Sequence, residues 1–280
     1  MPLIAITRPV SQNINDCELS FHSRQPIDLC KAIAQHADYQ NCLSALGLEM
    51  VSLSPEPDLP DAVFVEDPAV VVDEVAVIPI MGALSRRPET DSVAYALSRY
   101  RPIKRLITPA TLEGGDVMRV GRRIFVGLTQ RTNPEGFRQL RETLCDYGYQ
   151  VESVAVNGCL HLKSACSYIG NNSILINRAL VDSKAFQDLQ LIDVAEGEDA
   201  GANALVIGDV VIMPASFPKT RALLERRGFR VRTLDLSELQ KAEAGVTCTS
   251  LIFNGVTTMP SKLQSRKGDL KSRTKNKAVI

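Results

Sequence analysis

The sequence of 280 residues contains no tryptophan, and only 5% of its residues are aromatic. Aromatic platforms that stack on nucleic-acid bases are therefore not expected to dominate its chemistry. No apolar run approaches the roughly 20 residues that a membrane-spanning helix needs, so we expect no membrane segment. The first residues also lack a basic segment followed by a long apolar one, and we expect no secretion signal.

Paired cysteine motifs are missing as well. The seven cysteines are an odd number, and without a secretion signal they predict free thiols in a reduced cytoplasm. Cys-x-x-Cys and paired histidines are absent, and the spacing of Cys159 and Cys166 around His161 is unlike that of zinc motifs. We predict no metal and no cofactor, and we expect every cysteine except Cys248 to be an inert packing or surface thiol.

Charge is unevenly distributed along a chain whose formal net charge is zero. Residues 260–280 contain seven basic residues and one acidic residue, which gives +6, so residues 1–259 carry −6. The segment 260–280 has almost no apolar content, and we predict a disordered basic tail. A solvated terminus is favoured over an arm for nucleic acid, and residues 1–259 are expected to form a single domain.

A repeated pattern of two strands joined by a tight polar turn runs through the chain. It occupies residues 64–80, 112–128, 161–177 and 203–214, and a fifth copy begins at residue 247 and can pair with residues 3–6. Glycine, asparagine and aspartate at the turns suit the positive φ of tight hairpins. The period of roughly 40–50 residues is typical of propellers and solenoids. We predict an α/β fold of five ββαβ units around a pseudo-fivefold axis, an α/β-propeller.

Amphipathic segments separate the hairpins. Helices are predicted at residues 28–46, 90–100, 134–147, 182–189 and 218–227, and most are followed by a short strand. In the first of them, Leu29, Ile33, Ala37 and Leu43 recur at helical spacing and predict the buried face.

Polar residues stand at corresponding places near the start of each unit. They are Glu66 and Asp67, Glu113 and Asp116, His161, Asn203, and Cys248. Taken singly, each has a structural interpretation as a packing, turn or capping residue. A purely structural repeat would place similar apolar residues there, whereas these supply a thiol nucleophile, an imidazole acid/base and carboxylates that can hold a cation. Their coincidence favours a catalytic cluster.

Four motifs resemble a known enzyme family. Residues 60–67 (PDAVFVED), 112–116 (LEGGD), 161–164 (HLKS) and 245–250 (GVTCTS) are similar to those of the dimethylarginine dimethylaminohydrolases, within the pentein superfamily. The resemblance extends to about residue 253 and implies the same five-unit propeller. It also implies hydrolysis of Nω-methylated arginines to citrulline and a methylamine through a covalent intermediate, with no cofactor.

The resemblance also assigns roles to residues. Cys248 is the expected nucleophile and His161 the general acid and base, while Glu113 and Asp67 hold the guanidinium. Arg86 and Arg131 are expected to bind the substrate carboxylate, and Asp61 and the carbonyl of Leu19 its α-ammonium. Phe64 and Ser250 are expected to form walls of the pocket. Glu66 is expected to orient its neighbours. Because the carboxylates repel a third negative charge, we predict that Cys248 is a neutral thiol in the free enzyme.

Several questions stay open at this stage. Residues 11–26 are interpreted either as a lid over the site or as a connector without structure. Arginine deiminase and citrulline hydrolase are related alternatives, and a non-catalytic propeller scaffold is an alternative of another class. We expect a small-molecule partner, no nucleic acid and no membrane, and a homodimer is the assembly to test.

Overall fold

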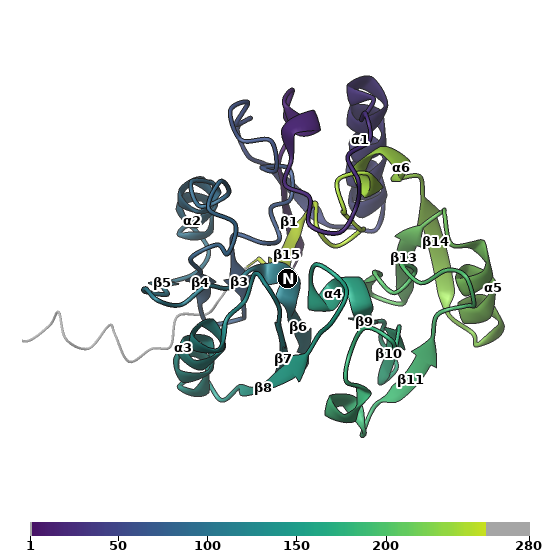
Figure 1. Cartoon of the computed structure of the whole chain (residues 1–280). Helices are drawn as coiled ribbons and strands as arrows, with labels where there is room; N and C mark the ends of the chain where they lie inside the picture. The colour runs from purple at the N-terminus through teal and green to yellow at the C-terminus, as the bar shows by residue number, and fades with distance from the viewer. Residues whose placement is uncertain (1, 256–280) are drawn as a thin grey trace, which may run out of the picture.

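The computed structural model describes residues 2–255, and its strands form five three-stranded sheets around a central axis (Figure 1). In each sheet the middle strand pairs antiparallel with one neighbour and parallel with the other. The repeat predicted from the sequence is therefore confirmed.

The strands are assigned to the sheets as follows. The sheets comprise β15 (Leu251–Asn254), β1 (Leu3–Thr7) and β2 (Glu49–Ser52); β3 (Val70–Val71), β4 (Ala76–Ile78) and β5 (Ile103–Arg105); β6 (Val117–Val120), β7 (Arg123–Leu128) and β8 (Gln150–Ala155); β9 (Cys166–Tyr168), β10 (Ser173–Ile176) and β11 (Gln190–Asp193); and β12 (Leu205–Ile207), β13 (Val210–Pro214) and β14 (Arg230–Leu234).

The ring is closed by strands from opposite ends of the described chain. β15 pairs antiparallel with β1 in a register that sets Leu3 opposite Asn254 and Ile6 opposite Leu251. Ile6 and Leu251 are both buried, and they pack in one apolar cluster with residues of the neighbouring sheet and of helix α2. The closure that the sequence predicted is confirmed, and apolar burial stabilises it.

The helices α1 (Leu29–Ala45), α2 (Glu89–Leu97), α3 (Pro134–Cys145) and α5 (Pro218–Arg226) lie on the outside of the ring (Figure 1). Asp28 caps α1 by accepting a hydrogen bond from the amide of Lys31, and Asn133 caps α3 in the same way through Gly136. The segment predicted as a helix at 182–189 forms only the 3-10 turn η3 (Ser183–Phe186). The remaining short elements are η1 (Ile14–Asp16), η2 (Gly114–Asp116), α4 (Leu162–Ala165) and α6 (Ser237–Gln240).

The predicted buried face of α1 was wrong in part. Ile33 is 49% exposed and Ala37 is exposed, whereas Ala32, Tyr39 and Cys42 are buried. The buried stripe includes polar residues, which an apolar count misses: Gln35 bonds α6 through the amide of Glu238, and the Tyr39 hydroxyl bonds Ser250. Hydrogen bonding therefore decides which face of this helix is buried.

The first strand of three units starts later than the sequence suggested. Residues 64–67 form turns before β3, residues 114–116 form η2 before β6, and residues 162–165 form α4 before β9. Asp67, Glu113 and Asp116 at these positions accept hydrogen bonds from backbone amides of other segments. The residues that precede the strands are thereby presented at one end of the ring.

Asp116 ties two of the units together at this end. Its carboxylate accepts hydrogen bonds from the hydroxyls of Thr129 (2.7 Å) and Thr132 (2.6 Å) and from the amide of Leu162 (2.9 Å). The side chain is fully buried. Asp116 therefore acts in the structure as an anchor for the start of α4, next to His161.

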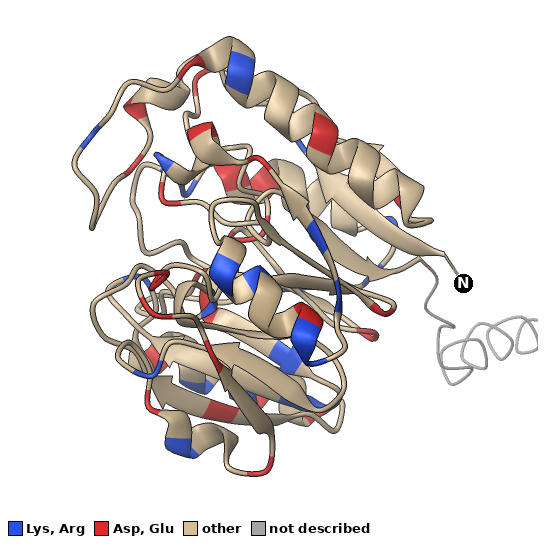
Figure 2. Cartoon of the chain, turned by 90° about the vertical axis from the view of Figure 1, so that its right-hand side faces the viewer, with Lys and Arg blue, Asp and Glu red and all other residues tan. Residues whose placement is uncertain are grey.

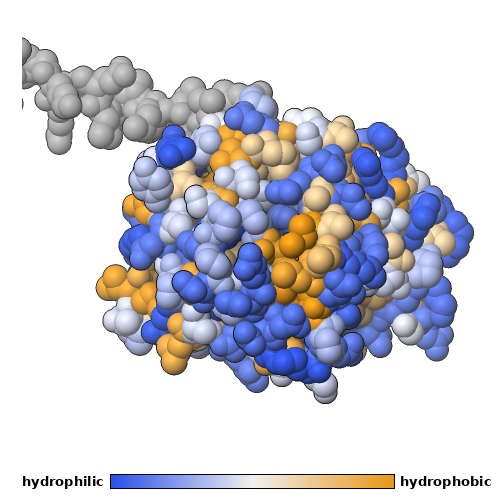
Figure 3. Space-filling model, turned by 90° about the horizontal axis from the view of Figure 1, so that it is seen from above, coloured by the Kyte–Doolittle hydropathy of each residue, from blue (hydrophilic) through white to orange (hydrophobic). Residues whose placement is uncertain are grey.

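Basic and acidic residues are interspersed along the ribbon in the view of Figure 2. Seen from above, hydrophilic side chains cover most of the molecule, with apolar side chains in smaller patches between them (Figure 3). No helix of residues 2–255 combines the length and the apolar character needed to cross a membrane. The basic segment 260–280 lies outside the described residues, and the domain boundary at 259 stays a prediction.

The anchor role of Asp116 predicts a difference between two substitutions. Asp116→Ala leaves a buried amide and two hydroxyls without their acceptor, and we expect the free energy of unfolding to fall by roughly 2–4 kcal/mol. Asp116→Asn keeps one carbonyl for the Leu162 amide and should cost less. Denaturant unfolding of both variants measures this, and equal stability of the two would contradict it.

Candidate active site

The residues predicted for the site converge at the end of the ring where the first strands begin. One small cavity is lined by Asp61, Phe64, Asp67, Arg86, Arg131, His161 and Cys248. We call it the nucleophile cavity. Asp67 precedes β3, His161 precedes α4 and Cys248 precedes β15, so three different units contribute its reactive side chains.

His161 and Glu113 form a buried ion pair. The imidazole Nε2 lies 2.8 Å from Oε2 of Glu113, and the other carboxylate oxygen accepts the amide of Ala83 at 3.0 Å. Burial disfavours the charged imidazole, but Asp67, Asp116 and Glu113 outweigh it and raise the pKa of His161 to about 9. Burial likewise disfavours the carboxylate, yet His161 outweighs it and lowers the pKa of Glu113 to about 2. At neutral pH the histidine is a proton donor.

Two glycines allow this group to pack closely. A Cβ atom added to Gly115 would lie 2.5 Å from Nδ1 of His161 and 2.7 Å from Oδ1 of Asp67. A Cβ atom added to Gly114 would lie 2.1 Å from the carbonyl oxygen of Glu66. All three distances are shorter than any real contact of a Cβ atom, so only glycine fits at these positions. The Gly-Gly pair after Glu113 therefore serves the packing of the site itself.

Asp67 is held by its surroundings. Its Oδ2 accepts a hydrogen bond from Nη1 of Arg86 at 2.7 Å, and its Oδ1 accepts the amide of Gly115 at 2.9 Å. Oδ1 also lies 3.9 Å from Nδ1 of His161. Arg86 bonds Glu89 and the carbonyl of Phe64 as well, so most of its five donors are in use.

Cys248 is a neutral thiol in this environment. Its sulfur accepts a hydrogen bond from the amide of Gly245 at 3.3 Å. Burial, together with the carboxylates of Glu66 and Asp67, raises the pKa of Cys248 to about 12. This direction agrees with the expectation from the sequence, because desolvation and negative neighbours both disfavour a thiolate.

A network of polar side chains supports the nucleophile loop from the neighbouring units. Asn203 accepts the amide of Thr247 at 3.2 Å and donates to the carbonyl of Lys163 at 2.9 Å. The hydroxyl of Thr247 donates to Glu66 at 2.7 Å, and Lys163 pairs with the same carboxylate. Asn203 therefore positions the loop that carries Cys248.

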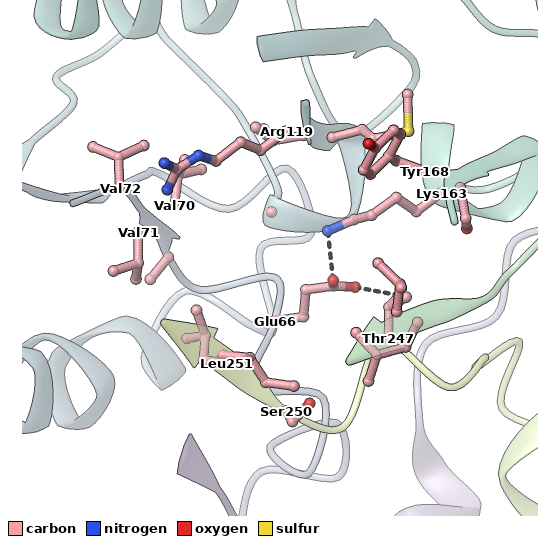
Figure 4. A pocket seen from close by; sticks show the side chains of 18 of the residues that line it. Glu66, Val70, Val71, Val72, Arg119, Lys163, Tyr168, Thr247, Ser250 and Leu251 are labelled. Atoms are coloured by element: carbon pink, nitrogen blue, oxygen red, sulfur yellow. Dashed lines mark hydrogen bonds and ion pairs between the residues drawn. The ribbon is translucent and has the colours of Figure 1, made fainter. Parts of the chain in front are cut away.

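The Glu66–Lys163 pair borders a second cavity of about 340 Å³, shown in Figure 4. We call it the axial cavity because strands from all five sheets line it. Thr247 and Ser250 also line it, whereas Cys248 and His161 do not. Glu66 thus supports the nucleophile loop from the axial side and is not among the residues that line the nucleophile cavity.

Two further predictions fit less well. The hydroxyl of Ser250 bonds that of Tyr39 at 2.6 Å, and Ser250 lines the axial cavity rather than the nucleophile cavity. Its role as a pocket wall at Cys248 stays a prediction. Leu19 is half-buried in the same apolar cluster as Phe64, and its carbonyl contact to a substrate stays a prediction.

The amino-acid end of the predicted substrate has two partners in contact with a nearby loop. Arg131 donates to Glu113 at 3.3 Å and to the hydroxyl of Ser20 at 3.1 Å. Asp61 accepts the amide of Glu18 at 3.1 Å, and burial raises its pKa despite the opposing charge of Arg86. These two residues and Phe64 line the nucleophile cavity, and their contacts with a substrate stay predictions.

Asp67, Glu113 and His161 also have the geometry of a metal-ligand set. Their donor atoms all lie within 4.8 Å of one another. A ligating histidine must be neutral, however, and the pKa of His161 is raised to about 9 by carboxylates after burial has opposed it. The arrangement therefore favours proton transfer over metal coordination.

Sequence reasoning missed three residues near the site. Lys163 lay inside the quoted 161–164 motif without a role, and it pairs with Glu66. Glu18 and Glu243 line the nucleophile cavity. Neither follows from the repeat, because Glu18 lies in a loop and Glu243 in a turn rather than at a repeat-equivalent position.

Comparison with known proteins gives a consistent result. A family described as N,N dimethylarginine dimethylhydrolase, eukaryotic, matches residues 5–249. The N(G),N(G)-dimethylarginine dimethylaminohydrolase of Pseudomonas aeruginosa is 37% identical over 89% of this chain and 98% of its own length. The enzyme of that name from Streptomyces coelicolor is 35% identical over 88% of this chain and 95% of its own length.

Solved structures agree. A cysteine-to-serine variant of the Pseudomonas aeruginosa protein in complex with citrulline superimposes with a TM-score of 0.85 at 34% identity, covering 90% of this chain and all of that one. The N-terminal domain of ArgZ, a cyanobacterial arginine dihydrolase, shares the fold with a TM-score of 0.81, but only 18% identity, over 92% of this chain and 99% of that one. The motifs, the five-unit fold and these matches together show that the chain belongs to the dimethylarginine dimethylaminohydrolase family.

Proposed function

We propose that this protein hydrolyses Nω-methylated arginines, both asymmetric dimethylarginine and monomethylarginine, to citrulline and a methylamine, with Cys248 as the nucleophile. The observation that carries the proposal is the nucleophile cavity itself, where Asp67 and His161 line one space with the Cys248 thiol and Glu113 contacts His161 from behind. The Pseudomonas aeruginosa relative is named for this activity and has been solved with citrulline, which supports the assignment.

Substrate recognition follows from the charges around the nucleophile cavity. Asp67 and Glu113 hold the guanidinium by charge-assisted hydrogen bonds. Arg131 binds the substrate carboxylate, and Arg86 contributes a remaining donor while it fixes Asp67. Asp61 and the carbonyl of Leu19 receive the α-ammonium, and Phe64 packs against the aliphatic chain. Each charged end of the substrate thus meets the opposite charge.

The arriving cation makes it easier for the neutral Cys248 thiol to lose its proton. A guanidinium next to Cys248 offsets the negative potential of Glu66 and Asp67, which lowers the cost of losing the thiol proton to solvent. The thiolate then forms an S–C bond to the guanidinium carbon. His161 donates its proton to the methylated nitrogen as the C–N bond breaks, and a thiouronium intermediate remains on Cys248.

The second half of the reaction uses the same histidine as a base. Neutral His161 takes a proton from water as the water oxygen attacks the thiouronium carbon. The C–S bond then breaks as the remaining hydroxyl proton of the adduct passes to the departing Cys248 sulfur, directly or through solvent, which releases citrulline and restores the neutral thiol. Glu113 stabilises the imidazolium at the start and the end of this cycle through its 2.8 Å contact.

Location and assembly belong to the same proposal. All seven cysteines are free, which supports a reducing cytoplasm as the location. A homodimer is proposed as the assembly, and sedimentation of the purified protein decides it. Incubation with methylarginines, arginine and citrulline distinguishes the proposed activity from that of an arginine deiminase, a citrulline hydrolase or a non-catalytic scaffold.

The first prediction concerns activity. Incubation with asymmetric dimethylarginine or monomethylarginine should yield citrulline and the matching amine, while arginine and citrulline react more slowly. Cys248→Ser should lower kcat by about 10³-fold or more, because the nucleophile is lost. Amine and citrulline analysis measures both. Absence of citrulline from either methylarginine, with the wild-type fold intact, would sink the proposal.

The second prediction concerns the thiol. Alkylation of Cys248 in the free enzyme should show an apparent pKa above the roughly 8.5 of an unperturbed thiol. A saturating, unreactive guanidinium compound should bring that pKa down. The rate of alkylation against pH, with Cys248→Ser as the blank, measures this. A strongly depressed pKa in the free enzyme would contradict the substrate-assisted step.

The third prediction concerns pH. His161 must carry its proton to expel the amine, so activity should fall as pH rises through about 9, the pKa of His161 raised by carboxylates against burial. Glu113→Gln removes the paired carboxylate, moves this alkaline limb to lower pH and lowers kcat about 10²-fold. Glu49→Gln, at an exposed strand position, is the control and should leave the profile unchanged. An unmoved alkaline limb in Glu113→Gln would contradict the ion pair's role.

A further inference from the structure

The loop from Cys17 to Arg24 borders the nucleophile cavity through Glu18. The amide of Glu18 bonds Asp61 at 3.1 Å, and the hydroxyl of Ser20 accepts a hydrogen bond from Arg131 at 3.1 Å. Arg24 folds back on the same loop and donates to the carbonyl of Cys17 at 2.6 Å. The loop is therefore ordered by contacts to two residues that the proposed function assigns to the amino-acid end of the substrate.

The side chain that holds this loop most firmly comes from the other end of the chain. The carboxylate of Glu243 accepts the backbone amides of Ser20 at 3.1 Å, Phe21 at 2.6 Å and His22 at 2.6 Å. Three successive amides that converge on one anion form a concave anion-binding site of the kind called a nest. Such charge-assisted hydrogen bonds are stronger than neutral ones.

Glu243 is also part of the turn that leads to the nucleophile. Its φ is +59°, a conformation that costs energy for a residue other than glycine. Two residues later, the amide of Gly245 donates to the sulfur of Cys248. One turn therefore carries both the carboxylate that holds the loop and the amide that contacts the thiol.

The volume of the nucleophile cavity shows what the loop does in this position. It is about 20 Å³, which is close to the minimum for one water molecule. By itself it is too small for a methylated arginine. It adjoins, at Cys248, a larger space of about 280 Å³ that Phe21 and His22 border. Residues of the loop thus line both spaces at the thiol, Glu18 the smaller one and Phe21 and His22 the larger one.

We propose that Glu243 is a positioning residue that latches residues 18–22 over the site and thereby sets the balance between closed and open forms. The substrate in this inference rests on the proposed function, whereas the latch rests only on the contacts of Glu243. Release of the three amides from Glu243 opens the loop so that substrate enters. Their return shields the thiouronium intermediate from bulk solvent.

Limited proteolysis tests the latch without any need for activity. Trypsin cleavage of the Arg24–Gln25 bond, followed by mass spectrometry of the fragment that ends at Arg24, reports opening of the loop. We expect Glu243→Ala to be cleaved there at least about tenfold faster than the wild type, because three charge-assisted hydrogen bonds are lost. Glu243→Asp keeps the carboxylate and should lie between the two.

The matched control is Glu49→Ala, an exposed glutamate on β2, which should be cleaved at the wild-type rate. Far-UV circular dichroism and thermal melting identify a variant whose whole fold is lost. Equal cleavage of the Arg24–Gln25 bond in wild type and a folded Glu243→Ala would overturn the latch.

Kinetics separate a positioning role from a merely structural one. Glu243→Ala should raise KM for a methylarginine about tenfold, because less of the enzyme closes on its substrate, with a smaller fall in kcat. Glu243→Asp should recover much of the loss. An unchanged KM in Glu243→Ala would contradict the proposal. Failure of the wild type to act on methylarginines would instead overturn the proposed function, while the cleavage result would still decide the latch.

Discussion

The buried ion pair between Glu113 and His161 is the interaction on which the site depends. Burying two charged groups costs free energy unless each has a partner of opposite charge and further hydrogen bonds. Here Nε2 of His161 lies 2.8 Å from Oε2 of Glu113, and the other carboxylate oxygen accepts a hydrogen bond from the amide of Ala83. The pair requires close packing, which Gly115 provides because a Cβ atom there would meet the imidazole. It also requires a fixed start for α4, which Asp116 provides through the amide of Leu162.

The same electrostatics determine what the site can attack. Burial, together with Glu66 and Asp67, raises the pKa of Cys248 to about 12, so the resting thiol keeps its proton at physiological pH. A cation reverses the balance. Asp67 therefore has two parts in the proposed mechanism: its charge disfavours the free thiolate and, together with Glu113, it holds the guanidinium.

The ring distributes these tasks among its five units. Asp67, Glu113, His161 and Cys248 come from four units, and Asn203 of the remaining unit supports the nucleophile loop. Because β15 pairs with β1, the closure of the ring also fixes the strand that follows the nucleophile. Loss of the pairing between β1 and β15 would therefore displace the loop that carries Cys248. The stability of the fold and the geometry of the site are coupled in this way.

The sequence by itself determined the repeat, the ring closure and the identity of the reactive side chains, because hairpin turns, apolar periodicity and the four motifs are local signals. Only the tertiary structure decided which groups meet. In the structure Glu113 pairs with His161, and the hydroxyl of Ser250 bonds that of Tyr39. The carboxylate of Glu243 accepts hydrogen bonds from backbone amides that lie 221–223 residues away in the sequence. Local patterns specify where a strand or helix forms, whereas such pairings arise from the packing of distant segments, which periodicity does not record.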